Sequence, residues 1–339
     1  MFAWWHRIKE RVGGWFRREP APGRLEEGSK LSAHGWVGSA PAVWPRRDYV
    51  VYVPKGAPRF RRSPLVVLLH GCKQTADDIA RGTRIAEFAD REGTVVLMPM
   101  QKDSANPWRC WNWFDPRTSR GDGEAAIVAA QIHSVRRRYR IDRKRVYVAG
   151  MSSGGALAAI LGVRFPRLVT AVAVHSGIAC GAAQSGMTAI SVLKRGPEQD
   201  VEAIAVAVRE AAMPHEIRVP LLAIHGDRDE VVPPAHAAAL VRQYLALNGD
   251  DPARAPDAQA RIPHPDGRVE IVHDWRRDGR LVVRHVEVQG LGHAWSGGDA
   301  SLDFNDAGAP DATALLVAFF ADALSFRPEG AKRRWRFWA

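Results

Sequence analysis

The sequence is poor in cysteine: its 339 residues include only Cys72, Cys110 and Cys180. Three cysteines cannot form the disulfide framework that holds a small secreted domain together, although one bridge beside a free thiol is allowed. No apolar run is long enough to cross a membrane as a helix. Internal repeats and long low-complexity tracts are also missing, which excludes repeat architectures and fibrous proteins.

Metal-ligand spacing and a secretory leader are missing as well. Several histidines do not pair at helical or turn spacing, so we expect structural roles for them and no metal site: His225, His236, His273 and His285. Residues 1–18 lack the uninterrupted apolar core and small-residue cleavage site of a signal peptide. We therefore expect no Sec signal peptide there.

The net charge of +11 is unusual, whereas 46% hydrophobic and 25% charged residues are ordinary for a soluble globular protein. A basic balance suits acidic partners such as nucleic acid or an anionic membrane, but a GC-rich genome that favours arginine explains it equally. Because basic charge alone does not specify nucleic acid, we expect no nucleic-acid partner. The length fits one large α/β domain with terminal extensions.

Both ends of the chain are basic and aromatic. Residues 1–18 carry an apolar stripe at helical spacing between arginines, formed by Trp4, Ile8, Val12 and Trp15. This pattern is typical of an amphipathic helix on a membrane or polymer-granule surface, but also of a helix packed on the protein body. The C-terminal counterpart is the segment KRRWRFW at residues 332–338.

Strand and helix patterns alternate along most of the chain. Apolar or alternating runs predict strands at residues 47–54, 65–69, 94–98, 146–149, 169–174 and 220–224. The segments between and after them predict helices at residues 75–91, 121–139, 156–163, 201–212, 235–247 and 311–324. This order predicts an α/β fold with a mostly parallel sheet flanked by helices on both faces. The chemistry should then lie at the carboxyl ends of the strands.

The remaining segments predict connections. Residues 19–29 and 248–265 predict a linker and a surface loop, residues 269–288 a hairpin, and residues 177–219 a small lid-like insertion. We expect the arginines at 136–138 to form a solvated helix end rather than a binding patch.

The run at residues 146–149 leads directly into Gly150-Met151-Ser152-Ser153-Gly154 and then into a helical pattern. Strand, tight turn and helix is the order that a nucleophile elbow needs, and glycines let strand and helix approach closely around the serine. Ser152 is therefore the candidate nucleophile. The backbone N–H of Ser153, at the start of the helix, is a candidate oxyanion donor.

Two further strand ends carry an acid and a base. Asp229 follows the strand at 220–224, and His293 follows the hairpin, which gives the order Ser, Asp, His used by α/β hydrolases. In this interpretation His293 is the general base and Asp229 fixes its tautomer. Asp227 is the rival acid, but it lies closer to the strand end, where we expect it to serve the turn.

The second oxyanion donor should come from the loop after the strand at 65–69. The backbone N–H of Cys72 is the candidate, and we expect its thiol to take no part because the pattern gives it no base of its own. A second loop, at residues 101–115, carries three tryptophans, Trp108, Trp111 and Trp113. They suit a wall for an apolar or ring-bearing ligand, or a plug at the sheet edge.

Five motifs together resemble the poly(3-hydroxybutyrate) depolymerase family of esterases, which is related to feruloyl and acetylxylan esterases: LLHGCKQ, CWNWF, RVYVAGMSSGG, HGDRDEVV and GLGHAWSGG. The resemblance covers roughly residues 49–326. It implies an α/β-hydrolase fold, a Ser152–Asp229–His293 triad, an oxyanion hole of the Cys72 and Ser153 amides, and no metal or organic cofactor. A Cys72–Cys110 bridge is a further hypothesis. We also expect substrate contacts from the same motifs: His70, Gln74, Trp108, Trp111, Trp113 and Trp295.

The resemblance implies a serine esterase for hydroxyalkanoate esters or their oligomers. Alternatives are a feruloyl or acetylxylan esterase and, more distantly, a non-catalytic surface or nucleic-acid binder. The family's polymer-degrading members are typically extracellular, whereas the missing signal peptide favours a cytoplasmic, granule-bound or membrane-peripheral location. We expect a catalytic domain between an N-terminal extension with a linker and a basic tail: residues 31–327, 1–30 and 328–339.

Overall fold

A computed structural model describes residues 24–31, 46–55, 62–197 and 199–323. The predicted amphipathic segment at residues 1–18 and the tail at 328–339 lie outside these ranges. Among the residues described, no helix combines the length and the apolarity that crossing a membrane requires.

Twelve strands are described, ten of which form one sheet. Their bounds are β1 Arg24–Leu31, β2 Arg46–Val53, β3 Ser63–Leu69, β4 Val95–Pro99, β5 Ile141–Met151, β6 Ala171–His175, β7 Leu221–Gly226, β8 Ala258–Pro263, β9 Val269–Arg277, β10 Arg280–Val288, β11 Trp295–Ser296 and β12 Asn305–Asp306. The sheet order is β1-β2-β4-β3-β5-β6-β7-β10-β9-β8, and β11 pairs with β12 separately. The strands from β4 to β10 in this order run parallel, and antiparallel strands extend the sheet at both edges.

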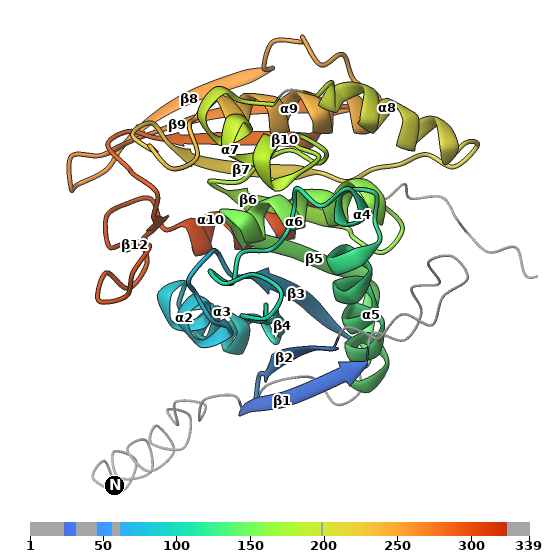
Figure 1. The fold of residues 1–339 in the computed structure, drawn as a ribbon. Coiled ribbons are helices and arrows are strands. Elements are labelled where there is room, and N and C mark those ends of the chain that lie inside the picture. The colour runs from blue at the N-terminus through green and yellow to red at the C-terminus, as the bar shows by residue number, and fades with distance from the viewer. Residues whose placement is uncertain (1–23, 32–45, 56–61, 198, 324–339) are drawn as a thin grey trace, which may run out of the picture.

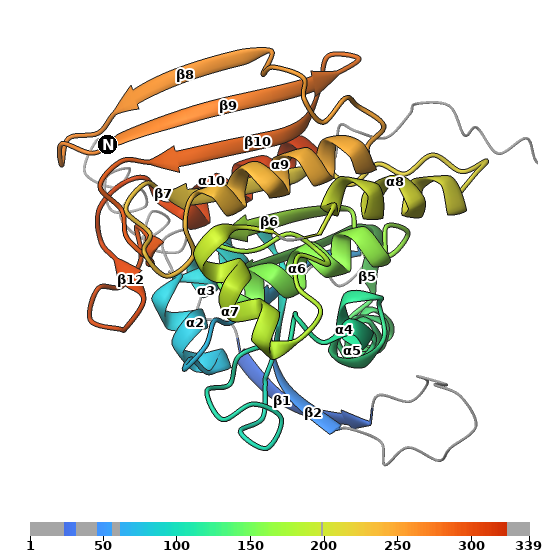
Figure 2. The same cartoon turned by 45° about the horizontal axis from the view of Figure 1, so that its top comes forward.

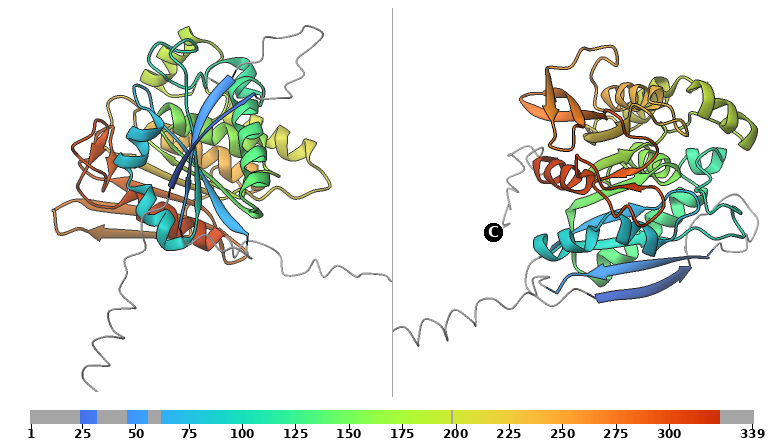
Figure 3. Two further views of the ribbon diagram at one scale, coloured as in Figure 1. Left: turned by 90° about the horizontal axis from the view of Figure 1, so that it is seen from below. Right: turned by 90° about the vertical axis from the view of Figure 1, so that its left-hand side faces the viewer.

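Helices cover both faces of this sheet, as the view from below shows (Figure 3). Their bounds are α2 Ala76–Gly82, α3 Ile85–Glu92, α4 Pro116–Ser119, α5 Gly123–Arg138, α6 Ser153–Arg164, α7 Gly186–Arg195, α8 Val201–Ala211, α9 Ala235–Leu247 and α10 Ala312–Ala323. One face carries α5, α6 and α9, and the other carries α3 and α10. The architecture is therefore the predicted α/β fold with a mostly parallel sheet (Figure 1).

The central strands form the core. Every residue of β4, β6 and β7 is buried, as expected for parallel strands with helices on both faces. This burial explains why their sequences are continuous apolar runs without alternation. On one face, the buried side of α6 is alanine- and glycine-rich, which brings its backbone close to the sheet.

Four sequence-based expectations differ from the structure. Residues 24–31 form β1 instead of ending a linker, and residues 258–263 form β8 inside the predicted surface loop. The helix expected at 75–91 is divided into α2 and α3, with Arg84 between them in the left-handed region at φ +53°. In the predicted lid-like insertion, α8 packs against α9 and thus belongs to the body (Figure 2).

Candidate active site

Ser152 lies at the turn between β5 and α6, with φ +55° and ψ −123°. Few non-glycine residues adopt a positive φ, and such strain persists only where the surrounding structure enforces it. Here the Ser152 N–H donates to the carbonyl of His175 at 3.0 Å, which fixes the turn against β6. The side chain of Ser152 is half-buried, so its hydroxyl remains accessible at the carboxyl edge of the sheet.

The two glycines of the turn are required by close packing. A Cβ on Gly150 would clash with the carbonyl of Gly154, and a Cβ on Gly154 would clash with the carbonyls of Leu69 and His70. These contacts bring the start of α6 onto the end of β3. The N–H of Ser153 and the loop after β3 therefore lie on the same side of Ser152.

Gly154→Ala should destabilise the protein by about 3 kcal/mol, because two backbone carbonyls must move to admit the methyl group. Urea unfolding measures this loss. Gly186→Ala is the matched control, since a Cβ there meets only the Phe114 ring at 3.6 Å. Equal stability of both variants would show that the turn has room that the packing does not indicate.

Asp229 and His293 are brought together by the loops after β7 and β10. The Nδ1 of His293 lies 2.8 Å from Asp229 Oδ2, and the Asp229 side chain is fully buried. Its other oxygen, Oδ1, accepts the backbone N–H groups of Val231 and Val232 at 3.0 and 2.8 Å. Burial, the largest single effect, raises the pKa of Asp229, but the hydrogen bond and charge of His293, the Val232 N–H and the charge of His225 together lower the pKa below its usual value. The carboxylate therefore stays ionised.

Asp227, the rival acid, has a different partner. Its Oδ1 accepts the N–H of Gly290 at 2.6 Å and so ties the end of β7 to the loop after β10. This loop bears His293. Asp227 thus holds the loop rather than the imidazole.

Two buried histidines that the sequence did not single out for the site lie beside it. The Nε2 of His225 donates to the carbonyl of Val232 at 2.7 Å and lies 3.5 Å from Asp229 Oδ2. His175 stacks on Trp295 with ring centroids 5.1 Å apart, and burial, with the charges of His225 and His293, lowers its pKa to about 3. Both rings are therefore neutral packing groups. In the sequence, only the positions of His175 and His225 at the ends of strands could have placed them near the site.

The loop after β3 and the tryptophan loop are joined by the Cys72–Cys110 disulfide, as hypothesised from the resemblance. The Oγ of Ser153 lies between the two loops, accepting the N–H of Trp111 at 3.3 Å with the Cys72 sulfur 3.5 Å away. These contacts hold the Cys72 backbone beside the start of α6. Among the described residues, none accepts a hydrogen bond from the Cys72 or Ser153 amide.

Removing the bridge with Cys72→Ala/Cys110→Ala should cost about 3–4 kcal/mol of unfolding free energy, because the 38-residue separation restrains a long loop. We also expect lower ester turnover, since the Cys72 backbone loses a restraint. Dithiothreitol should have the same effects on the native protein and none on the double variant. A native protein that is indifferent to reduction would contradict this role.

His70 and Gln74 lie inside the loop after β3 rather than on its surface. His70 is 1% exposed; its Nε2 accepts the Gln101 N–H at 3.1 Å and its Nδ1 lies 2.8 Å from the Gly71 carbonyl. Burial lowers its pKa to about 4. Gln74 Oε1 accepts the Gly71 N–H at 2.8 Å. These bonds favour a structural role for both residues, in place of the predicted contact with substrate.

The predicted substrate-binding tryptophans divide in the same way. Trp108 is 64% exposed, whereas Trp111, Trp113 and Trp295 are buried. The indole N–H of Trp111 donates to the His70 carbonyl at 3.1 Å, and that of Trp295 donates to the Thr313 hydroxyl at 3.1 Å. Trp108 alone of the four has its ring open to solvent, so within the tryptophan loop the plug interpretation suits Trp111 and Trp113 better.

Glu124, at the start of α5, organises the tryptophan loop and was not predicted. It is 6% exposed, and its Oε2 accepts the Asn112 N–H at 2.7 Å while its Oε1 accepts from Asn112 and Gln101 side chains. Arg47 lies 3.5 Å from the same oxygen. Sequence gave no signal for this role, because an acidic residue in a first helical turn is usually exposed.

No group of three or more histidine, cysteine, aspartate or glutamate side chains is placed to hold a metal within the part of the chain that is described.

Comparison with known proteins gives a family match and two similar relatives. Residues 47–260 match the profile of a family described as esterase PHB depolymerase. Poly(3-hydroxyalkanoate) depolymerase C of Paucimonas lemoignei is 28% identical over 247 residues, which is 71% of this chain and 57% of that protein. Feruloyl esterase B of Neurospora crassa is 30% identical over 216 residues, 60% of this chain and 73% of that protein.

A solved structure shares the fold. The acetyl xylan esterase from Aspergillus awamori aligns with a TM-score of 0.65 at 20% identity, covering 80% of this chain and 94% of the other. An S-formylglutathione hydrolase from Agrobacterium tumefaciens aligns with a TM-score of 0.52 at 15% identity, covering 90% and 94%. The α/β-hydrolase fold expected from the sequence is thus confirmed.

Proposed function

The chain belongs to the PHB depolymerase family of esterases, and on that premise we propose that it hydrolyses carboxylic esters through an acyl-enzyme on Ser152. The observation that carries the proposal is the Asp229–His293 pair after β7 and β10, at the same edge of the sheet as the strained turn of Ser152 after β5. Of the two serines with a positive φ among the described residues, Ser152 is half-buried and Ser176 is fully buried, so only Ser152 is open to an ester.

In the first step His293 Nε2 takes the proton of the Ser152 hydroxyl while its oxygen attacks the ester carbonyl. The amides of Cys72 and Ser153 donate to the oxyanion that forms. The protonated imidazole then gives its proton to the leaving alcohol, and the acyl group stays on Ser152. Water, deprotonated by His293, attacks the acyl-enzyme, and the imidazolium returns that proton to the Ser152 oxygen as the acid leaves. Throughout, the Asp229 carboxylate accepts the hydrogen bond from the Nδ1–H of His293.

For the acyl group we propose a hydroxyalkanoate ester, as polymer or oligomer. Support comes from exposed apolar side chains in two segments that meet near Phe114: Trp108 is 64% exposed, and Met187 and Ile190 on α7 are 84% and 62% exposed. Such side chains suit an extended apolar chain. A feruloyl ester is the second candidate, because the Neurospora relative is a feruloyl esterase and the exposed indole of Trp108 could stack on a phenolic ring.

Covalent trapping tests the mechanism. The Ser152 oxygen should attack the phosphorus of an organophosphate such as paraoxon and expel p-nitrophenolate. A diethyl phosphate ester then remains on that residue. Mass spectrometry of the peptide should find the adduct on Ser152 and not on Ser153 or Ser176. An adduct elsewhere, with ester turnover abolished, would refute the assignment.

The substrate class is tested by a product screen. Poly(3-hydroxybutyrate), its soluble oligomers, methyl ferulate and acetylated xylan should be compared at equal enzyme concentration. We expect the highest kcat/KM on hydroxybutyrate oligomers. Highest kcat/KM on methyl ferulate or acetylated xylan would overturn the acyl-group proposal and leave the mechanism intact.

A further inference from the structure

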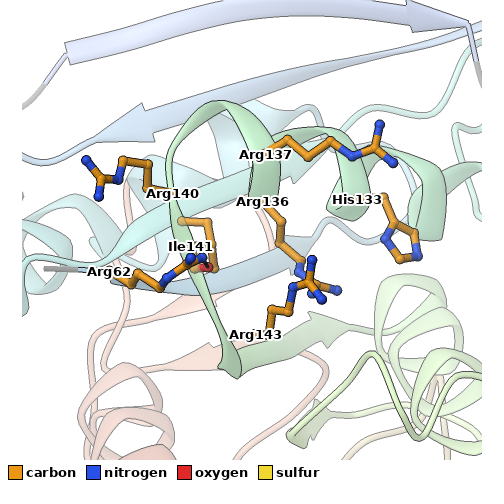
Figure 4. A pocket seen from close by; sticks show the side chains of 7 residues that line it. All are labelled: Arg62, His133, Arg136, Arg137, Arg140, Ile141 and Arg143. Carbon is orange, nitrogen blue, oxygen red and sulfur yellow. Dashed lines mark hydrogen bonds between the residues drawn. The ribbon is translucent and has the colours of Figure 1, made fainter. Parts of the chain in front are cut away.

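A second candidate site lies at the start of β5, whereas Ser152 lies after its end. A cavity of about 420 Å³ is lined by Arg62, His133, Arg136, Arg137, Arg140, Ile141 and Arg143 (Figure 4). We call it the arginine pocket. It opens where α5 ends and β5 begins, whereas Ser152 follows the other end of β5. The extended run from Val146 to Ser152 alone separates the two by about 20 Å.

Three segments of the chain supply the cations. The last turns of α5 bear Arg136 and Arg137, and the start of β5 bears Arg143. Arg62 precedes β3, and because Ser63 pairs with Ile141, it is held next to Arg140. The carbonyls at a helix C-terminus attract basic residues and account for those of α5 alone. They do not explain cations from the other two segments.

These arginines lack counter-charges. Among the described residues, no carboxylate lies within 4.0 Å of any of the five, while the neighbouring Arg138 and Arg145 pair with Glu26 and Asp142 at 2.9 and 3.1 Å. The segment therefore pairs two arginines that do not line the pocket with carboxylates and leaves those lining it without such a partner.

Arg136 is half-buried, whereas the other four arginines of the pocket are exposed. Its Nε is buried and has no hydrogen-bond partner, which is costly for a charged group. Figure 4 shows the guanidinium groups of Arg136 and Arg143 pointing toward one another. Burial, followed by the charge of Arg143, lowers the pKa of Arg136, and burial with nearby arginines lowers that of His133. The site is thus pre-arranged for an anion that would satisfy the Nε and separate the like charges.

In place of the solvated helix end expected for residues 136–138, we propose that the arginine pocket binds a small ligand carrying two or more phosphate groups. Guanidinium groups match phosphate oxygens in a two-point geometry, and several convergent cations suit several charges on one small molecule. A cavity of this volume is of small-ligand size.

Larger anionic partners fit less well. A nucleic-acid strand is bound by cations that follow its backbone, whereas these converge on one cavity. A membrane surface requires apolar side chains beside the cations. The exposed large apolar side chains among the described residues all lie elsewhere: Trp108, Met187, Ile190, Met213, Val231 and Ile262.

Calorimetric titration with tripolyphosphate at low ionic strength tests the proposal. Arg136→Gln/Arg143→Gln should weaken binding at least about tenfold. Arg81→Gln/Arg91→Gln, which removes two exposed arginines from α2 and α3, should bind like the native protein. Near-UV circular dichroism checks that the variants fold. If the first variant does not, Arg137→Gln/Arg140→Gln, at exposed positions, takes its place.

Further arms identify the ligand class. Sulfate, with one group, should bind more weakly than tripolyphosphate. The proposal is overturned if tripolyphosphate does not bind, or if both variants weaken it equally. In the first case, binding of phosphatidylglycerol vesicles or of a single-stranded oligonucleotide through Arg136 and Arg143 would identify a membrane or a nucleic acid as the partner instead.

Discussion

Ser152→Ala should lower kcat for p-nitrophenyl butyrate at least about 10⁴-fold, because the variant has no oxygen with which to form the acyl-enzyme. KM should change little, since the hydroxyl is not expected to contribute to binding of the ground state. A variant of unchanged fold with native turnover would remove Ser152 from the mechanism. Stability should be nearly native, as alanine fits the half-buried site without a new contact.

Ser176→Ala is the matched control for this experiment. Ser176 also has a positive φ, at +49°, and follows β6, the strand next to β5. It shares the strain and the position at the sheet edge but is fully buried. We expect it to retain most of its activity. Equal loss in both variants would mean that alanine acts through the local fold and not through the nucleophile.

Asp229→Asn should lower kcat by about 10³- to 10⁴-fold with the fold intact. The reason is the orientation of the new amide. Two backbone N–H groups, from Val231 and Val232, already donate to Oδ1, so the amide oxygen must stay there. The NH₂ group is then directed at His293 Nδ1 and donates to it. This fixes the tautomer in which Nε2 carries the proton, and such an imidazole cannot accept the proton of Ser152.

Asp227→Asn makes the same substitution two residues earlier. Its acceptor role toward the Gly290 N–H requires one oxygen, which an amide supplies. Turnover should therefore remain close to native. Steady-state kinetics over a pH range compares the two variants, and similar losses in both would show that the loop, rather than the His293 tautomer, is sensitive.

Much of the fold could be predicted because the central strands leave a strong pattern. Strands such as β4 and β7 are buried on both faces, so their apolar runs are unmistakable. The missed strands are at the edges. Every residue of β8 is exposed, and its conformation comes from backbone pairing with β9, which places no demand on its side chains. The residue types of β8 therefore did not indicate a strand.

The site was predicted unevenly for a similar reason. Ser152, Asp229 and His293 each follow a strand that the pattern located, and because these strands run parallel, their place at one edge of the sheet followed from topology. The direction of side chains within loops did not follow. Trp111 and Trp108 are neighbours in one loop, yet the first is fully buried and the second 64% exposed. The buried carboxylate of Glu124 lies outside this loop and holds it through the N–H and side chain of Asn112.

The strand that joins Ser152 to the arginine pocket has a consequence for their thermodynamic coupling. β5 pairs with β3 at Ile141 and from Val146 to Gly150, and with β6 from Tyr147 to Met151. A shift of β5 along its axis would break both ladders, so the strand has one register and no second state for a ligand to select. Occupancy at one end should therefore leave affinity at the other unchanged, and the two sites should behave as independent equilibria within one rigid sheet.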